Sequence, residues 1–277
     1  MFFKSINGIY LYVAENLERN KMVIVNRDIL LKSVFPVIIE DGHGVPKLQT
    51  GTGFILNYGG FSYVLTAWHC ISSFIRKAYG LTDDYNITGD DIRDVIEKYI
   101  FFGAIKSEQS IYRIPLDQVY SAVEPIGNRA DIFICKVDME SLTTDKKENS
   151  SLNELYPLEL YSRNLYIGAE YHVWGYPQRF TKIEDDDVKV SFEHRYLRLE
   201  KINPAQNNPL TFETGILDFS STKDTYSTLE GFSGGAVTND CNQVVGLAYE
   251  ITNDKKMHFI TANSIHYMIQ KIMRNQN

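Results

Sequence analysis

The chain has 277 residues and a formal charge of −7, and 44% of its residues are hydrophobic. This composition is that of a folded globular protein with enough apolar material for a sizeable core. A net negative charge disfavours partners that carry phosphate, so we expect neither a nucleic acid nor a membrane surface as a partner. No stretch approaches the ~18 apolar residues that span a bilayer, and residues 1–14 make a poor signal peptide. We therefore expect a cytoplasmic protein.

Short strands separated by turns dominate the first half of the sequence. Residues 34–39 form an apolar run that is typical of a buried strand. Residues 51–56 and 61–66 flank a turn that ends in Gly59 and Gly60, and glycine takes up positive φ at little cost. This pattern predicts a strand, a tight turn and a second strand. Further strands are predicted at residues 100–104, 111–115 and 131–137.

Helical spacing interrupts these strands once. Ser72 to Tyr79 and Asp90 to Tyr99 are predicted to be helices, and the apolar residues of the second recur at i, i+3, i+4 and i+7. Together they make residues 72–118 an insertion with its own helices.

The second half is again rich in strand signals. A polar stretch at Asp138 to Glu154 is the best linker candidate. Strands are predicted beyond it at residues 171–174, 189–199, 211–218, 235–238, 243–249 and 257–261. Residues 264–273 have the spacing of an amphipathic closing helix. Two halves of short strands around a linker predict a mostly β protein made of two small barrels. The predicted parts are an N-terminal extension at 1–32, a first barrel at 33–138, a linker at 139–156 and a second barrel at 157–277.

Ser233 stands among glycines in the segment Gly231 to Gly235. A nucleophilic serine needs its hydroxyl exposed on a tight turn, and neighbours without Cβ let a substrate backbone approach. Backbone N–H groups beside Gly231 can then point at a developing oxyanion. Taken alone, the segment is equally compatible with a glycine-rich hairpin that contains an incidental serine.

His69 and Asp131 supply the other parts of a triad. His69 follows the predicted strand at 61–65, and Asp131 begins an apolar strand. Each has an ordinary alternative, as a packed or surface histidine and as an acid at a strand start. With Ser233, however, they fit a triad in which the base takes the serine proton and the acid fixes the tautomer of the base.

Several blocks of the sequence, spread over residues 33–275, resemble the trypsin-like serine peptidase superfamily. They are Thr66-Ala67-Trp68-His69-Cys70, Ala130-Asp131-Ile132, Trp174-Gly175-Tyr176-Pro177, Gly231 to Gly235, and Gln243 to Leu247 followed by Phe259 to Thr261. The pattern is most similar to bacterial glutamyl endopeptidases and HtrA-type proteases. The resemblance implies two six-stranded antiparallel β-barrels and hydrolysis of peptide bonds through an acyl-enzyme. It assigns the nucleophile to Ser233, the base to His69 and the orienting acid to Asp131. It also implies an oxyanion hole made by the backbone N–H groups of Gly231 and Ser233.

Two positions depart from the family pattern. The family pairs Cys70 with a cysteine in the preceding strand, and Gly51 to Phe54 contains none, so we expect Cys70 to be reduced. Phe232 replaces the acid that pairs with a newly cut amino terminus in secreted zymogens. Activity is then either constitutive or controlled by other means, such as a regulatory protein partner.

The resemblance also places a substrate pocket. Ser227 and Thr228 are expected at its floor and wall, as in glutamyl endopeptidases, with Ala248, Tyr249 and Glu250 on the specificity strand. Ala248 stands where those enzymes carry a histidine, which weakens the case for an acidic substrate residue. Glu250 is compatible with a basic residue through charge pairing, and a solvated loop carboxylate is the alternative.

We expect neither a metal nor a cofactor. The acidic run Glu184 to Asp187 lacks the glycine and the spacing of a calcium loop. The remaining histidines have no mutual spacing typical of ligands and are expected to be structural or on the surface: His43, His172, His194, His258 and His266. The predicted function is a serine endopeptidase acting on protein or peptide substrates. The alternatives are a catalytically idle scaffold that binds peptides or partners, and an esterase or acyltransferase on the same triad.

Overall fold

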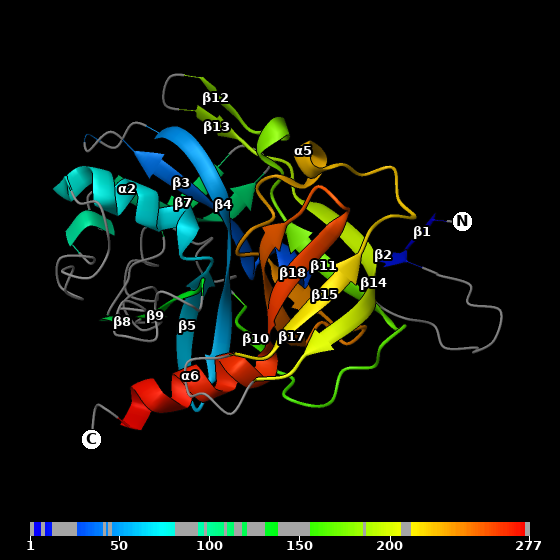
Figure 1. Ribbon diagram of the computed structural model, residues 1–277. Helices are drawn as coiled ribbons and strands as arrows, with labels where there is room; N and C mark the ends of the chain where they lie inside the picture. Colours follow the sequence, from blue (N-terminus) through cyan, green and yellow to red (C-terminus); the bar gives the residue numbers. More distant parts are fainter. Residues whose placement is uncertain are drawn as a thin grey trace.

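The computed structural model describes residues 3–6, 9–12, 27–40, 43, 46–80, 94–96, 99–107, 110–113, 118–120, 131–137, 156–184, 187–205 and 212–274. Two β units lie side by side, with the earlier strands on the left of Figure 1 and the later strands on the right. A short antiparallel hairpin of β1 (Phe3–Ile6) and β2 (Ile9–Tyr12) precedes them. The expected linker at 138–154 lies outside the described residues.

The N-terminal unit is a largely antiparallel sheet with the strand order β7-β6-β3-β4-β5-β9-β8, and β10 pairs with β4 in parallel. Its elements are α1 (Arg27–Leu31), β3 (Val34–Glu40), β4 (Pro46–Tyr58), β5 (Phe61–Thr66), α2 (His69–Tyr79), β6 (Ile100–Ser107), β7 (Ser110–Arg113), β8 (Gln118–Tyr120), β9 (Phe133–Val137) and β10 (Leu158–Glu159). β3 is buried along its whole length, as predicted. The predicted turn between β4 and β5 is confirmed, with φ of +59° at Gly59 and +83° at Gly60. Among the described residues no pairing joins β7 to β8, so closure of this sheet into a barrel stays a prediction.

The helices of this unit differ in extent from the prediction. α2 begins at His69 rather than at Ser72, because Cys70 and Ile71 already turn into the core beneath the sheet. Of the second predicted helix, residues 94–96 and 99 are helical, and Val95 and Ile96 are buried. The remainder of that segment lies outside the described residues.

The C-terminal unit is a closed barrel with the strand order β11-β14-β15-β18-β17-β16. Its elements are β11 (Glu170–Gly175), η3 (Gln178–Phe180), β12 (Lys182–Glu184), β13 (Asp187–Lys189), β14 (Glu193–Asn203), β15 (Thr214–Asp218), α5 (Tyr226–Leu229), β16 (Ala236–Thr238), β17 (Val244–Ile251), β18 (Lys256–Thr261) and α6 (Ala262–Arg274). The predicted strand at 189–199 is wrong in extent. Lys189 ends a separate hairpin, because β13 pairs with β12 and not with the barrel.

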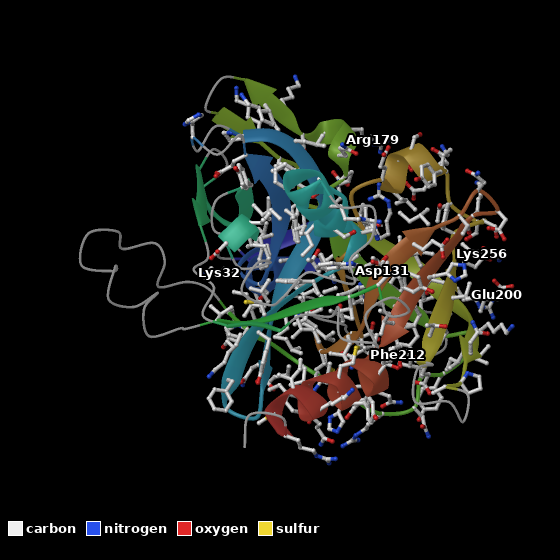
Figure 2. The ribbon with its side chains drawn as sticks, turned by 60° about the vertical axis from the view of Figure 1, so that its left-hand side comes forward. Lys32, Asp131, Arg179, Glu200, Phe212 and Lys256 are labelled. Atoms are coloured by element: carbon white, nitrogen blue, oxygen red, sulfur yellow. The ribbon has the colours of Figure 1, made fainter. Side chains whose placement is uncertain are left out.

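Ion pairs on the outside of the barrel join three neighbouring strands. Lys256 Nζ lies 2.6 Å from the Glu200 carboxylate and 3.2 Å from the Asp218 carboxylate. Figure 2 shows Lys256 and Glu200 together at the outer edge of the barrel, whereas Asp131 lies between the two units.

One hydrophobic core is shared by both units. It contains Phe54, Leu56 and Leu65 of the sheet, Trp174, Val244 and Leu247 of the barrel, and Ile265, Met268 and Ile269 of α6. The predicted closing helix is confirmed, and it runs beneath both units at the bottom of Figure 1. No helix in the described part of the chain is both long and apolar enough to cross a bilayer.

Candidate active site

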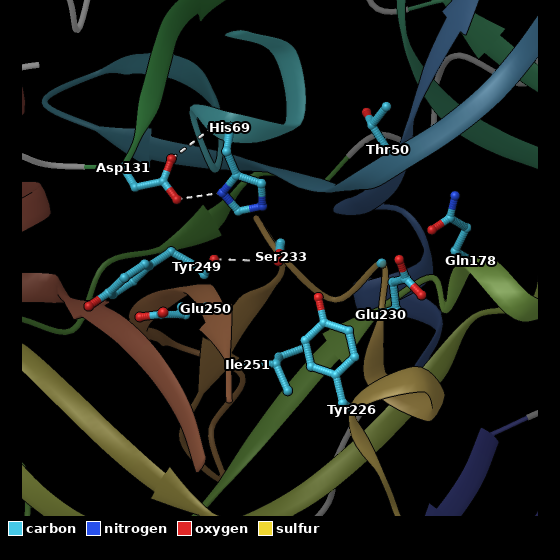
Figure 3. A pocket seen from close by; sticks show the side chains of 11 residues that line it. Thr50, His69, Asp131, Gln178, Tyr226, Glu230, Ser233, Tyr249, Glu250 and Ile251 are labelled. Carbon is cyan, nitrogen blue, oxygen red and sulfur yellow. Dashed lines mark hydrogen bonds and ion pairs between the residues drawn. The ribbon is translucent and has the colours of Figure 1, made fainter. Parts of the chain in front are cut away.

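The register between β5 and β9 brings the candidate base and acid together. β5 ends at Thr66, which pairs with Phe133 at the start of β9. His69, the first residue of α2, therefore lies beside Asp131 (Figure 3). The His69 backbone N–H donates to Asp131 Oδ1 at 2.8 Å, and its ring Nδ1 lies 2.5 Å from Oδ2. An ionised carboxylate only accepts hydrogen bonds, so Nδ1 carries a proton, and in the neutral imidazole Nε2 is left as the acceptor.

The same contacts determine the basicity of His69. Burial lowers the pKa of His69, but the hydrogen bond to Asp131 and the neighbouring Cys70 outweigh it and raise the pKa to about 10. The imidazole remains 47% exposed, so water also solvates its charged form. His69 is thus a stronger base than a free imidazole and stays protonated to higher pH.

Ser233 lines the same cavity as His69 and Asp131. Its Oγ donates to the carbonyl of Tyr249 at 3.4 Å, the contact drawn in Figure 3. The described hydrogen bonds do not include one from Ser233 to His69 Nε2, which instead lies 3.7 Å from Cys70 Sγ. Catalytic hydrogen bonds are often long or misaligned in a protein without substrate, so this geometry does not exclude the pair.

The close packing of the backbone requires glycine at both positions after Ser233. Gly234 has φ +86°, and a Cβ there would lie 1.9 Å from the carbonyl oxygen of Thr52. A Cβ on Gly235 would lie 2.2 Å from the carbonyl oxygen of Trp174. The expectation that these glycines serve the approach of substrate is therefore incomplete, because they also let the serine turn pack against β4 and β11.

Two backbone N–H groups beside Ser233 are available to a ligand. The Glu230 carbonyl accepts from Gln178 N–H and the Phe232 carbonyl accepts from Gly235 N–H, both at 2.8 Å. In a trans peptide the N–H points opposite to the C=O, so these bonds point the Gly231 N–H away from Gln178 and the Ser233 N–H away from Gly235. Neither N–H has an acceptor within the described part of the chain. This is the arrangement that the oxyanion-hole prediction requires.

Phe232 is fully buried among the side chains of the second barrel. The guanidinium of Arg195 lies 5.8 Å from the centre of its ring. Arg195 is itself paired with Glu193 and with Asp224, at 3.1 and 3.0 Å. The side chain between Gly231 and Ser233 is therefore an apolar core residue that carries no charge into the serine turn.

The cavity has a volume of about 490 Å³. Its lining consists of Thr50, His69, Asp131, Gln178, Tyr226, Glu230, Gly231, Ser233, Tyr249, Glu250 and Ile251. Tyr249 and Glu250 were predicted to lie there. Among the described residues, the lining includes three carboxylates and no lysine or arginine.

Three predicted pocket residues do not line this cavity. Ser227 and Thr228 lie on α5, and the Thr228 hydroxyl bonds to Asp224 and to the backbone of Thr225, where it caps the helix. Ala248 is buried, and its backbone bonds to the serine turn.

Other residues, which were not predicted from the sequence, line the cavity in their place. Tyr226 and Glu230, at the two ends of α5, line the cavity instead, together with Thr50, Gln178 and Ile251. The only local signal was that Glu230 directly precedes Gly231.

Cys70 forms no disulfide, as predicted. A Cβ on Gly51 would lie 2.3 Å from Cys70 Sγ and 2.7 Å from the Ser233 carbonyl oxygen. Gly51 therefore leaves the space that the thiol occupies beneath the serine turn.

The barrel, the shared core and the cavity with His69, Asp131 and Ser233 define the class of a β-barrel hydrolase with a serine site. Residues 51–247 match the family described as Trypsin-like peptidase domain. The chain therefore belongs to the trypsin-like peptidase family and is a trypsin-like serine protease. No curated protein sequence matches the chain significantly.

Deg5 and human heparin binding protein share the fold at low sequence identity. Deg5 is 13% identical with a TM-score of 0.53, and the match covers 93% of this chain and 94% of Deg5. Human heparin binding protein is 13% identical with a TM-score of 0.52, covering 90% of this chain and 94% of that protein. The active form of the Rv3671c protease from M. tuberculosis is 17% identical with a TM-score of 0.49, covering 94% of each chain.

Proposed function

We propose that this protein is a serine endopeptidase in which Ser233, His69 and Asp131 form a catalytic triad. The observation that carries the proposal is one cavity that holds the His69–Asp131 pair, the Ser233 hydroxyl and two N–H groups without a protein acceptor among the described residues. A base, a nucleophile and oxyanion donors around one space are the parts that acyl transfer needs.

The proposed reaction proceeds through an acyl-enzyme. Ser233 Oγ attacks the carbonyl carbon of a peptide bond while His69 Nε2 takes the hydroxyl proton. The oxyanion accepts hydrogen bonds from the Gly231 and Ser233 N–H groups. The C–N bond then breaks, His69 returns its proton to the leaving amine, and an ester remains on Ser233. Water attacks that ester with His69 as base, which releases the acid and restores the Ser233 hydroxyl.

One movement precedes this reaction. The Ser233 hydroxyl leaves the carbonyl of Tyr249 and turns to Nε2 of His69. Rotation about χ1 of Ser233 is the motion that we propose for this change.

We propose a reducing, cytoplasmic setting, which the unbridged Cys70 supports. We also propose that the N-terminal sheet is the counterpart of the closed barrel in a double-barrel protease, since β3, β4, β5 and β9 are consecutive in one sheet. Control by a regulatory protein partner stays a separate proposal.

A fluorophosphonate probe tests the proposed function directly, because it phosphonylates only an activated serine. Wild-type protein is expected to be labelled, and Ser233→Ala and His69→Ala are expected to lose labelling by about 10⁴-fold or more. Ser227→Ala, which removes a hydroxyl on α5 outside the cavity lining, is the matched control and is expected to label like the wild type. Labelling that survives Ser233→Ala would overturn the assignment.

A catalytically idle scaffold is the second candidate. It is favoured by the bond of Ser233 to Tyr249 instead of His69. Among the proteins of this fold, one is named for binding heparin rather than for hydrolysis. Absence of labelling in folded wild-type protein would favour this candidate.

A further inference from the structure

Thr52 of β4 joins the N-terminal sheet to the loop that presents the proposed oxyanion donors. We call residues 230–234 the oxyanion loop. The Thr52 hydroxyl donates to the Gly231 carbonyl at 2.6 Å, and the Thr52 N–H donates to the Ser233 carbonyl at 2.8 Å. Thr52 is fully buried. One residue of the first unit thus holds two carbonyls of a loop in the second.

The remaining polar atoms of Thr52 are also occupied. The pairing of β4 with β5 ends at Gly53 and Thr66, and beyond it the Thr52 carbonyl accepts from the Thr66 hydroxyl at 2.6 Å. The Thr52 hydroxyl oxygen accepts from the Tyr176 N–H at 3.0 Å. A buried polar group with every bond satisfied contributes to rigidity, whereas removal of one partner leaves the others buried and unpaired.

The bonds of Thr52 fix the peptide between the two proposed donors. The Gly231 N–H is directed by the Glu230–Gly231 peptide, and the Ser233 N–H by the Phe232–Ser233 peptide. Thr52 holds the Gly231 carbonyl, which belongs to the peptide between these two. Rotation of that peptide would change ψ of Gly231 and φ of Phe232, the two torsions that connect it to the peptides carrying the donors.

A neighbouring glutamine supports the opposite side of the loop. Gln49 of β4 is buried, and its amide donates to the Tyr176 carbonyl at 2.5 Å. Gly231 packs against this segment so closely that a Cβ would lie 2.4 Å from the same carbonyl oxygen. The Tyr176 hydroxyl reaches back to the Val34 carbonyl of β3 at 3.2 Å. The loop is therefore held between Thr52 and the Tyr176 segment, and β4 supports both.

All of these contacts are neutral. Phe232, in the middle of the loop, carries no charge and lies in the apolar core of the barrel. No ion pair of the loop with the rest of the described chain contributes to its position.

We propose that Thr52 is the positioning residue of the oxyanion hole, and that it keeps the hole assembled without an ion pair to the oxyanion loop. This inference rests on the proposed function, since it assigns a role to the loop of that site. Under this proposal, contacts within the folded chain hold the oxyanion donors in place, so their alignment does not require a newly formed ion pair.

The test measures kinact and KI of the fluorophosphonate separately in Thr52→Val, which keeps the shape of the side chain and removes its hydroxyl. The phosphonylation transition state places negative charge on an oxygen in the hole, so loss of donor alignment lowers kinact. We expect kinact to fall about 10- to 100-fold with KI unchanged. Thr52→Ser keeps the hydroxyl and is expected to restore most of kinact.

Thr238→Val is the matched control. Thr238 is also fully buried and accepts a hydrogen bond, from Trp174 Nε1 at 2.9 Å, but it does not contact the oxyanion loop. We expect it to lower the unfolding temperature and to leave kinact within about threefold of the wild type. If Thr52→Val does not fold, Gln49→Met carries the test, with an expected loss of at least about fivefold in kinact.

The outcomes separate the two proposals. Wild-type protein without labelling at Ser233 would refute the proposed function. Wild-type protein that labels, together with a folded Thr52→Val variant (or Gln49→Met in its place) whose kinact is unchanged, would refute the role of Thr52 alone. An equal loss of kinact in Thr238→Val would also refute it, because the effect would then be general loosening.

Discussion

At the scale of single residues, Asp131 sets the protonation of His69. In the proposed mechanism the neutral imidazole takes the serine proton, and the raised pKa of His69 shifts the formation of this neutral form to higher pH. We therefore expect kcat/KM to rise with pH along a limb whose midpoint lies above 6.5, the ordinary histidine value. In Asp131→Asn the limb should move to lower pH and the maximal rate should fall by about 10⁴.

A pH–rate profile of wild type and Asp131→Asn checks this prediction. The stability of the fold depends on pH in the opposite direction from the activity. Because the folded pKa of His69 is raised, its charged form stabilises the fold below pH 6.5, and this contribution is lost as the pH rises through about 10. A limb at or below 6.5 in the wild type would contradict the geometry at Asp131.

Glu230 and Glu250 determine the charge of the cavity. Neither forms an ion pair with a described residue, and the part of the chain that the structure describes places no lysine or arginine in the lining. A cleft of one sign concentrates ligands of the opposite sign, so we expect cleavage sites enriched in lysine or arginine over aspartate or glutamate.

A peptide-library cleavage profile measures this preference. Glu250→Gln is expected to reduce the preference for a basic residue over its uncharged analogue by about fivefold, because the carboxylate is exposed and screened. Glu200→Gln makes the same charge change at the outer edge of the barrel (Figure 2) and should leave the profile unaltered. A preference for acidic residues would be incompatible with the lining.

At the scale of elements, β4 does more than supply a strand of the sheet. It provides Gly51 beneath the nucleophile and Thr52 beside the oxyanion loop. Gly51→Ala would force a methyl group against Cys70 Sγ and the Ser233 carbonyl. We expect fluorophosphonate labelling to fall at least about tenfold, since overpacking here displaces the serine turn.

Gly60→Ala is the control for this variant. Gly60 has φ +83°, and a Cβ there would meet no atom within 4 Å, so the substitution costs only backbone strain. That strain amounts to about 1 kcal/mol. Labelling rates and thermal unfolding of the two variants distinguish a local displacement from general destabilisation. Equal labelling in both would contradict the packing described for Gly51.

Elements set by local pattern were predictable from the sequence. The turn at Gly59 and Gly60, the strand β3 and the helix α6 follow from glycine placement and apolar spacing. The residues that line the cavity were not predictable from the sequence, because the contribution of α5 depends on which side of that short helix faces the cavity.

Side-chain contacts between neighbouring strands were also not predictable from the sequence, because they depend on the strand register. His172 and His194 show no spacing in sequence that suggests contact, yet their ring nitrogens lie 2.7 Å apart on the paired strands β11 and β14. Asp240 hydrogen-bonds to the other nitrogen of His172 at 3.1 Å. Burial lowers the pKa of His172, and Asp240 opposes the shift. Only the strand register, which a single sequence does not contain, joins the three.

At the scale of the whole molecule, the shared core makes the two units depend on each other. Ile269 of α6 is fully buried in the cluster that also contains residues of both units. Ile269→Ala is expected to lower the free energy of unfolding by about 2–5 kcal/mol through lost burial and cavity formation. We expect one transition for the whole chain, because the core that is weakened belongs to both units.

Chemical denaturation followed by circular dichroism and by tryptophan fluorescence checks this prediction. Trp68 reports on the N-terminal unit and Trp174 on the barrel. Tyr267→Ala, on the same helix but 51% exposed, is the control and should change stability little. Two separate transitions, one for each tryptophan, would show that the units unfold independently.

The position of α6 also has a consequence for the order of events during synthesis. The ribosome releases His69 and Ser233 well before it releases Ala262 to Arg274, yet the core beneath both units is incomplete until that helix packs into it. Domains fold as they emerge, but here the two halves that bring His69, Asp131 and Ser233 together are joined last. A nascent chain therefore carries all three of these residues before it has the means to hold them in one place.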